Sequence, residues 1–168
     1  AYVQEVDKGV DRFFSDLLGA HVRLVKQSQK DERQHFDVKL NKNIPVSLAD
    51  GYPYLCIGSR SMDILNSKLE FPVSIDRFRP NIVLEIITVL VVVDYGKVII
   101  GEVYSLNMKP CARCMVVNIN QQTSKSEKEP LATLNAYRKT NNKIFFGTNL
   151  MCTEEGYISV GEKCTHLK

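Results

Sequence analysis

Apolar side chains near the start of the chain recur every three to four residues, the spacing of one face of an α-helix. The positions that share this spacing are Val6, Val10, Phe13, Phe14, Leu17 and Leu18. Gly19 follows directly, where a left-handed residue commonly ends a helix. The pattern predicts an amphipathic helix over residues 5–18, then a short alternating strand at 21–26 and a polar loop at 27–34.

The middle of the chain carries short apolar runs separated by turn residues, which is typical of β-strands. Residues 54–57 lie between Pro53 and Gly58 and predict a strand, and a short helix follows with Ser59 or Ser61 as its N-cap. Further strands are predicted at 73–75, 82–93, 98–106, 115–119, 144–146 and 157–160, with a turn at Asp94-Tyr95-Gly96 and a helix opened by Pro130. This order predicts an α+β, mostly β fold, a β-barrel or strongly curved sheet with peripheral short helices.

The length and charge of the chain indicate a single globular domain that binds a small ligand rather than nucleic acid. The chain has 168 residues, of which 44% are hydrophobic and 24% charged, so we expect one domain over residues 1–168 with a continuous core. Its net charge of +3 is spread over 22 basic and 19 acidic residues, which argues against nucleic-acid binding and favours a small anionic ligand. Because the first residue is Ala1 rather than methionine, we expect a fragment of a longer protein.

Membrane and secretion signals are weak in this sequence. The longest apolar run, at 86–93, is interrupted by Thr88 and falls well short of the roughly 20 residues that cross a bilayer. The N-terminus lacks the basic, apolar and small-residue order of a signal peptide. The odd number of cysteines, five, favours intracellular thiols over a disulfide framework.

The segment Pro110-Cys111-Ala112-Arg113-Cys114 is the first candidate for chemistry. A guanidinium between two thiols stabilises the thiolate form, which a soft metal, a persulfide carrier or a redox couple requires. A structural zinc would need further ligands, and no second pair at ligand spacing occurs among Cys56, Cys152, Cys164, His21, His35 and His166. A thioredoxin-like dithiol is disfavoured because a strand is predicted after Cys114, and two core cysteines without a role remain the plain alternative.

Two polar segments could bind an anion. Asp76-Arg77-Phe78-Arg79-Pro80-Asn81 precedes an apolar strand, and its arginines and asparagine offer donors to a phosphate or to the edge of a heterocycle. The alternative interpretation is an ordinary charged strand end. Gly58-Ser59-Arg60-Ser61 precedes a short helix, where hydroxyls and free N–H groups could hold a phosphate or simply cap the helix.

Several of these motifs together resemble the MOSC domain, the C-terminal module of molybdenum cofactor sulfurases. The matching segments are Arg79-Pro80-Asn81, Ile100-Gly101, Cys111-Ala112-Arg113-Cys114, Glu129-Pro130-Leu131 and Phe146-Gly147, together with the Leu18-Gly19 helix end and the 54–69 unit. The resemblance implies a MOSC-type β-barrel that binds molybdopterin. It also implies that Cys114 coordinates molybdenum and that Arg79 and Asn81 hold the pterin and its phosphate. Cys111, Arg113, Ser59 and Ser61 are expected to bind the cofactor as well, and Asp50 lies in a segment that approaches it.

Within this superfamily, three segments look more like the eukaryotic sulfurases than the amidoxime-reducing components. They are Leu24-Val25-Lys26-Gln27-Ser28, Ile119-Asn120-Gln121-Gln122-Thr123 and Lys143-Ile144-Phe145-Phe146-Gly147. The resemblance implies a cytoplasmic acceptor domain that presents the cofactor to a persulfide-donating, aminotransferase-like domain. That domain, with its pyridoxal phosphate, is not in this chain, and molybdenum hydroxylases would receive the product. The alternatives are a molybdenum-dependent amidoxime reductase at the mitochondrial outer membrane and a non-catalytic MOSC interaction module.

Two departures from the family pattern bear on cofactor binding. Between Asn81 and Gly101 the family usually carries an acidic pair and a tryptophan, whereas this chain reads Val91-Val92-Val93-Asp94-Tyr95 and contains no tryptophan. The upstream β domain that is usual in the superfamily, and that adds basic residues around the cofactor, is not part of the sequence. We therefore expect the fold to be retained and the affinity of the isolated domain to be weak.

Overall fold

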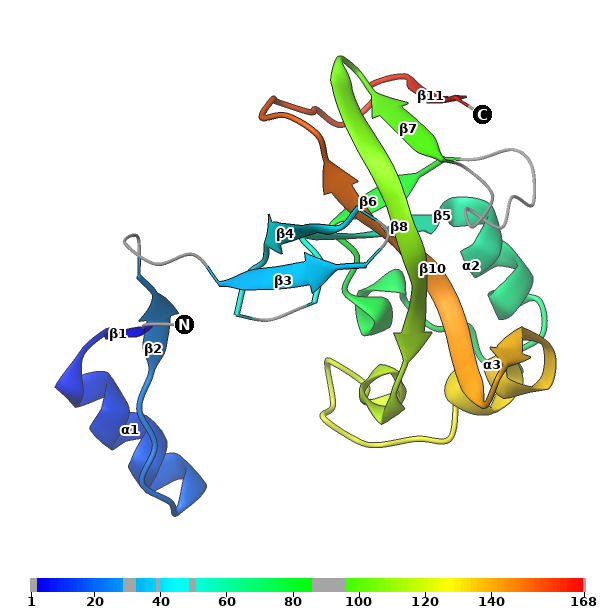
Figure 1. Ribbon diagram of the computed structural model, residues 1–168. Helices are drawn as coiled ribbons and strands as arrows, with labels where there is room; N and C mark the ends of the chain where they lie inside the picture. Colours follow the sequence, from blue (N-terminus) through cyan, green and yellow to red (C-terminus); the bar gives the residue numbers. More distant parts are fainter. Residues whose placement is uncertain (1–2, 29–32, 39, 49–50, 86–95, 168) are drawn as a thin grey trace. The chain divides into compact units, whose positions relative to one another are not determined.

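A computed structural model describes residues 3–28, 33–38, 40–48, 51–85 and 96–167. The chain divides into two compact units, residues 1–53 and 54–168. Figure 1 shows the elements of both. Residues 86–93 of the strand predicted at 82–93 lie outside the described residues, as do Asp50, Asp94 and Tyr95.

The first unit contains the predicted N-terminal helix, α1 (Lys8–Leu18), beside a short antiparallel pair, β1 (Val3–Glu5) and β2 (Val25–Gln27). The helix begins later than predicted because Asp7 caps it, accepting hydrogen bonds from the N–H groups of Gly9 and Val10. It ends at Gly19, whose φ of 62° is the predicted left-handed cap. The predicted strand at 21–26 is confined to β2.

The rest of the first unit is a hairpin of β3 (Gln34–Asp37) and β4 (Lys42–Pro45). Gln34, predicted to be in a loop, is the first residue of β3. Beside the hairpin, the Tyr52 hydroxyl donates a 2.7 Å hydrogen bond to Asp37 Oδ2, and both side chains are buried. Burial, together with this carboxylate, raises the pKa of Tyr52 to about 12.

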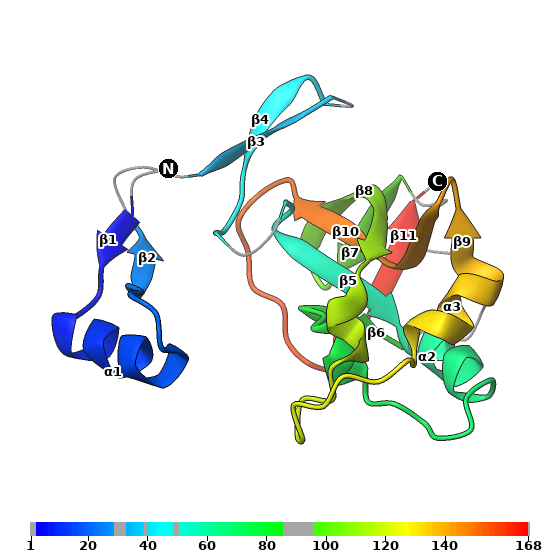
Figure 2. The same cartoon turned by 90° about the horizontal axis from the view of Figure 1, so that it is seen from below.

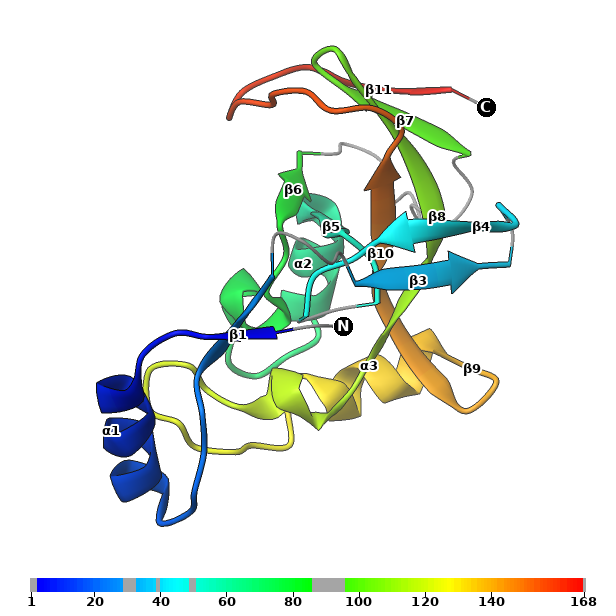
Figure 3. The ribbon, with the colours of Figure 1, turned by 60° about the vertical axis from the view of Figure 1, so that its left-hand side comes forward.

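The second unit is mostly β, as predicted. Within the part of the chain that the structure describes, it holds a strongly curved, nearly closed sheet in the order β11-β7-β8-β10-β5-β6, with β9 paired to β10 (Figures 1 and 2). The strands are β5 (Tyr54–Gly58), β6 (Ile82–Leu84), β7 (Lys97–Ile100), β8 (Val103–Arg113), β9 (Lys139–Thr140), β10 (Lys143–Cys152) and β11 (Cys164–Leu167). The long strands β8 and β10 run antiparallel through its middle, as Figure 3 shows.

Short helices accompany this sheet. They are α2 (Ser59–Asn66), α3 (Leu131–Arg138) and the 3₁₀ helices η1 (Ile75–Phe78) and η3 (Met115–Asn118). All contribute to one apolar cluster on the sheet: Ile57, Met62, Leu65, Val73, Phe78, Val117, Leu134 and Phe146. The residue before Ile57, Cys56, faces the opposite side of β5, where it joins Ile82, Leu84, Val98, Ile100 and Leu150. The sheet is thus buried on both faces.

Several predicted strands differ from the observed elements. The apolar run at 98–106 is a hairpin rather than one strand, because Gly101, with φ of 59°, turns the chain between β7 and β8. Residues 73–75 lead into η1, and residues 115–118 form η3 instead of a strand. Residues 157–160 are irregular, and the last strand, β11, comes later. The β6 strand ends at Leu84.

Candidate functional site

The cysteine segment lies at the end of β8. Cys111 is a partly buried residue inside the strand, whereas Cys114 is exposed and precedes η3 in extended conformation, with φ of −116°. The prediction that a strand follows Cys114 is wrong, since a 3₁₀ helix stands there. That removes one argument against a thioredoxin-like dithiol, but Cys111 within β8 does not occupy the helix N-terminus where the first thiol of such a pair is activated.

Arg113 joins the cysteine segment to η1. Its Nη1 donates a 3.0 Å hydrogen bond to Cys111 Sγ, and its Nη2 donates a 2.7 Å bond to the carbonyl oxygen of Phe78. The guanidinium also lies over the Phe78 ring, 5.4 Å from its centroid. The structure therefore brings together Cys111, Arg113 and the peptide that precedes Arg79.

Arg79 occupies a left-handed position at the end of η1, with φ of 52° and ψ of 50°. This conformation costs a residue other than glycine on the order of 1–2 kcal/mol. The side chain is exposed, and among the described residues its guanidinium has no hydrogen-bond or ion-pair partner. A fixed backbone with an unpaired cation is a suitable donor for an anion.

Arg77, two residues earlier, has a different environment. It is buried, with 7% of its surface exposed, and its Nη1 donates to the carbonyl oxygens of Asn118 and Glu129. Its Nη2 lies 2.7 Å from Glu127 Oε2, and this bond lowers the pKa of Glu127. Arg77 therefore ties η1 to η3 and to the loop before α3 and is not available to a ligand, whereas a ligand-binding role for Arg79 stays a prediction.

Asn81 is fixed beside β5 by a pair of hydrogen bonds. Its backbone N–H donates to the carbonyl oxygen of Leu55 at 2.9 Å, and its Oδ1 accepts from the N–H of Leu55 at 2.8 Å. The carboxamide therefore extends the parallel β5–β6 pairing by one residue. Its Nδ2 group is the part that remains for a ligand.

Ser59 and Ser61 lie elsewhere. They belong to the first turn of α2, whose N-cap is Gly58, and no side chain in the described structure caps this helix. The prediction that a serine serves as the N-cap is therefore wrong. Asn81 pairs near the start of β5 and Ser59 follows its last residue, so at about 3.3 Å per residue the two are separated by most of the strand.

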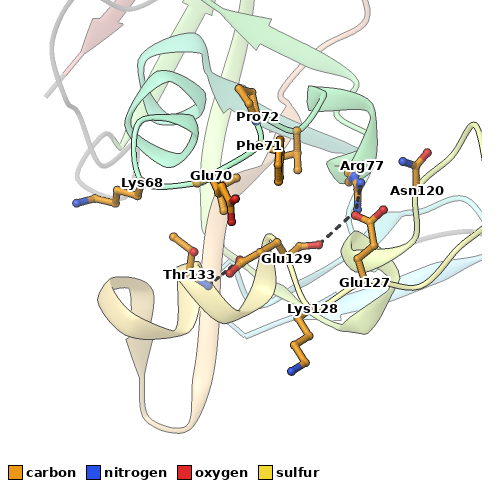
Figure 4. A pocket seen from close by; sticks show the side chains of 12 residues that line it. Lys68, Glu70, Phe71, Pro72, Arg77, Asn120, Glu127, Lys128, Glu129 and Thr133 are labelled. Atoms are coloured by element: carbon orange, nitrogen blue, oxygen red, sulfur yellow. Dashed lines mark hydrogen bonds and ion pairs between the residues drawn. The ribbon is translucent and has the colours of Figure 1, made fainter.

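A cavity of about 480 Å³ opens beside Arg77, between the loop after α2 and the start of α3 (Figure 4). It is lined by Lys68, Leu69, Glu70, Phe71, Pro72, Val73, Arg77, Asn120, Glu127, Lys128, Glu129 and Thr133. None of the cysteines is among these residues. The cavity is distinct from the cluster around Arg113, and no motif in the sequence predicted it.

The other cysteines and the histidines do not form a metal centre in the described part of the chain, where no group of three or more metal-ligating side chains is found. All five cysteines are free thiols. Cys56 is fully buried, and burial, reinforced by the nearby Cys164 thiol, raises its pKa to about 12.

No described helix is long and apolar enough to span a bilayer.

Comparison with known proteins gives the context for this cluster. The family described as the MOSC domain matches residues 43–165. The molybdenum cofactor sulfurase of Oryza sativa subsp. japonica is 31% identical over 162 residues, which cover 86% of this chain and 20% of that protein. Mitochondrial amidoxime-reducing component 1 of Homo sapiens is 32% identical over 126 residues, 70% of this chain and 37% of that protein. The chain spans less than half the length of either relative.

Proposed function

This chain belongs to the MOSC domain family, and on that basis we propose that it binds the molybdenum cofactor, with the Cys114 thiolate as the protein ligand to molybdenum. The observation that carries the proposal is the cluster around Arg113. Cys114 is exposed one residue after this arginine, and the same guanidinium contacts the peptide that leads into Arg79. Arg113 thereby connects the segment that carries the Cys114 thiol to the segment that carries the Arg79 guanidinium and the Asn81 carboxamide.

The donor set suits the cofactor. A thiolate is the ligand that a soft metal prefers, and an unpaired guanidinium is the donor best matched to a phosphate. The Nδ2 group of Asn81 can donate to an acceptor on the pterin edge while its Oδ1 stays bonded to Leu55. The proposal does not depend on Ser59 or Ser61, which lie at the other end of β5.

In this proposal each of the three residues has a separate role. Cys114 anchors the metal, Arg79 binds the phosphate, and Asn81 orients the heterocycle. When bound, the cofactor would supply a redox-active metal that can carry a sulfur ligand. Because the Cys114 segment is exposed, a protein that carries a persulfide can approach it from solvent.

We further propose that the chain is the acceptor part of a molybdenum cofactor sulfurase. The rice relative of that name covers 86% of this chain. The persulfide-donating, pyridoxal-phosphate-dependent domain would act as its partner, and molybdenum hydroxylases would receive the sulfurated cofactor. A cytoplasmic location would follow from this role.

A second candidate function is amidoxime reduction. The human amidoxime-reducing component is as similar to this chain as the rice sulfurase is, at 32% against 31% identity. The same thiolate, guanidinium and carboxamide would then hold the cofactor while it transfers electrons to an N-hydroxylated substrate. A location at the mitochondrial outer membrane belongs to this candidate.

Metal and pterin analysis of protein purified from a host that makes the cofactor tests the proposed binding. Because the affinity of the isolated domain is expected to be weak, we expect the wild type and Cys164→Ser, a matched control in which another exposed cysteine is replaced, to retain molybdenum and pterin to the same extent rather than a full equivalent. Cys114→Ser should lose the molybdenum. Metal content in Cys114→Ser equal to that of the wild type would contradict the ligand assignment, and a wild type without pterin would instead favour a non-catalytic interaction module.

A separate assay distinguishes the two roles. Loaded protein that reduces benzamidoxime in the presence of an electron donor is a reductase. Loaded protein that gains cyanide-releasable sulfur from a persulfide-bearing protein, without reducing benzamidoxime, is a sulfurase acceptor. In both cases Cys114→Ser is expected to be inactive.

A further inference from the structure

We infer that Arg113 is a positioning residue, which orients Arg79 toward the ligand and does not itself bind the ligand. This inference rests on the proposed function and assigns a task within the same cluster. Sequence reasoning places Arg113 among the residues that contact the cofactor. The contacts of its guanidinium lead to a different role.

The first contact fixes the peptide between Phe78 and Arg79. Arg113 Nη2 donates to the carbonyl oxygen of this peptide, that of Phe78, at 2.7 Å. The N–H group of the same peptide, that of Arg79, donates to the carbonyl oxygen of Asp76 at 3.1 Å. Both polar groups of the peptide are thus held. Since this peptide directly precedes the left-handed backbone of Arg79, its orientation sets the direction in which the Arg79 side chain leaves η1.

The second set of contacts fixes Arg113 itself. Its guanidinium lies over the ring of Phe78, which is 1% exposed and packs on Phe146 with centroids 4.5 Å apart. Its Nη1 donates to Cys111 Sγ at 3.0 Å, within the same strand. The arginine is therefore held between β8 and η1, with both terminal nitrogens donating to the protein.

A lysine could not replace these contacts. The planar guanidinium donates in two directions and stacks on an aromatic ring, whereas an ammonium group on a flexible stem is a point charge. The geometry therefore requires arginine at position 113 for its shape. At position 79, where no protein partner is present among the described residues, the positive charge itself is the feature available to a ligand.

A double-mutant cycle tests this division of roles. We expect Arg79→Ala and Arg113→Met each to weaken binding of the molybdenum cofactor about tenfold to a hundredfold, the value of a charged hydrogen bond. The double variant should bind no more weakly than Arg79→Ala, because Arg113 acts through Arg79. Losses that multiply in the double variant would overturn the inference. Arg12→Met, which removes an exposed arginine on α1, outside every candidate segment, is the matched control and should bind normally.

Arg113→Lys separates positioning from charge. We expect it to bind as weakly as Arg113→Met, and binding equal to that of the wild type would show that the charge alone matters, contrary to the inference.

A measurement without cofactor keeps the inference separate from the proposed function. Hydrogen–deuterium exchange of the free protein should be faster at residues 76–81 in Arg113→Met than in the wild type, with unchanged exchange in β5 and α2. The same exchange at 76–81 in both proteins would overturn the inference. If exchange changes as expected but no protein binds the cofactor, the proposed function fails while the role of Arg113 in fixing the Arg79 turn stands.

Discussion

Arg77 and Glu127 form a 2.7 Å ion pair across 50 residues of sequence, with the arginine buried and the carboxylate partly exposed. The same guanidinium donates to two backbone carbonyl oxygens, those of Asn118 and Glu129. One side chain thus connects η1, which leads into Arg79, with η3, which follows Cys114, and with the loop before α3.

Replacing Arg77 should destabilise the second unit. Arg77→Ala removes the donors to two carbonyl oxygens, and we expect a loss of about 2–3 kcal/mol in the free energy of unfolding, to which the solvent-screened bond to the exposed Glu127 adds little. Urea denaturation followed by tyrosine fluorescence measures it. The control Arg60→Ala removes an exposed pair with Asp63 and should change stability by less than about 0.5 kcal/mol, so equal losses would contradict the assigned role of Arg77.

The same ion pair predicts acid sensitivity. The hydrogen bond from Arg77 lowers the pKa of Glu127, so its contribution to stability is complete above the ordinary pKa of a glutamate and is lost as pH falls through the lowered value. Glu127→Gln should remove the part of the pH dependence of stability that comes from this carboxylate. Urea midpoints measured between pH 7 and pH 3 should converge for the two proteins at the acid end, and a constant difference over that range would speak against the linkage.

Gly147 is required by the bulge in β10. It has φ of 80°, and a Cβ there would lie 2.8 Å from the carbonyl oxygen of Cys56. We expect Gly147→Ala to cost about 2–4 kcal/mol, from backbone strain and from this contact with main-chain atoms. Gly161→Ala provides the control, because Gly161 has φ of 91° and no described atom within 4 Å of the added Cβ, and it should cost about 1 kcal/mol. A smaller loss at 147 than at 161 would refute the steric argument.

The cysteines should differ sharply in reactivity. Cys56 is 0% exposed and its pKa is raised to about 12 by burial, whereas Cys114 is exposed. Brief alkylation of native protein at pH 8 should therefore label Cys114 and leave Cys56 unlabelled until urea is added, as peptide mass spectrometry would show. Labelling of Cys56 at the same rate as Cys114 would mean that β5 is open to solvent.

Sequence reasoning predicted well where a short local pattern decides the structure. The helix at α1 follows from its apolar spacing and from Gly19, and β5 follows from a short apolar run between turn residues. The single run predicted at 98–106 failed because both arms of the β7–β8 hairpin are apolar. Only the left-handed Gly101 between them distinguishes a turn from a continuous strand.

Long-range contacts account for the other differences. The predicted strand at 115–119 is instead the 3₁₀ helix η3 over residues 115–118. There the Asn118 carbonyl oxygen accepts a hydrogen bond from the distant Arg77, and Asn118 Oδ1 accepts one from the N–H of Leu131. Long-range contacts also decide the roles of the two arginines at the candidate site. Nothing in the local sequence distinguishes Arg77 from Arg79, although one is buried with an acidic partner and the other is exposed.

The left-handed backbone at Arg79 places two demands on one position. Glycine would adopt φ of 52° without strain, so a chain selected for stability alone would carry glycine or asparagine there. An arginine keeps the cation at the expense of backbone energy. Under the proposed function, Arg79→Gly should therefore yield a protein that is more stable and binds its ligand less well, a trade-off between durability and activity confined to a single residue.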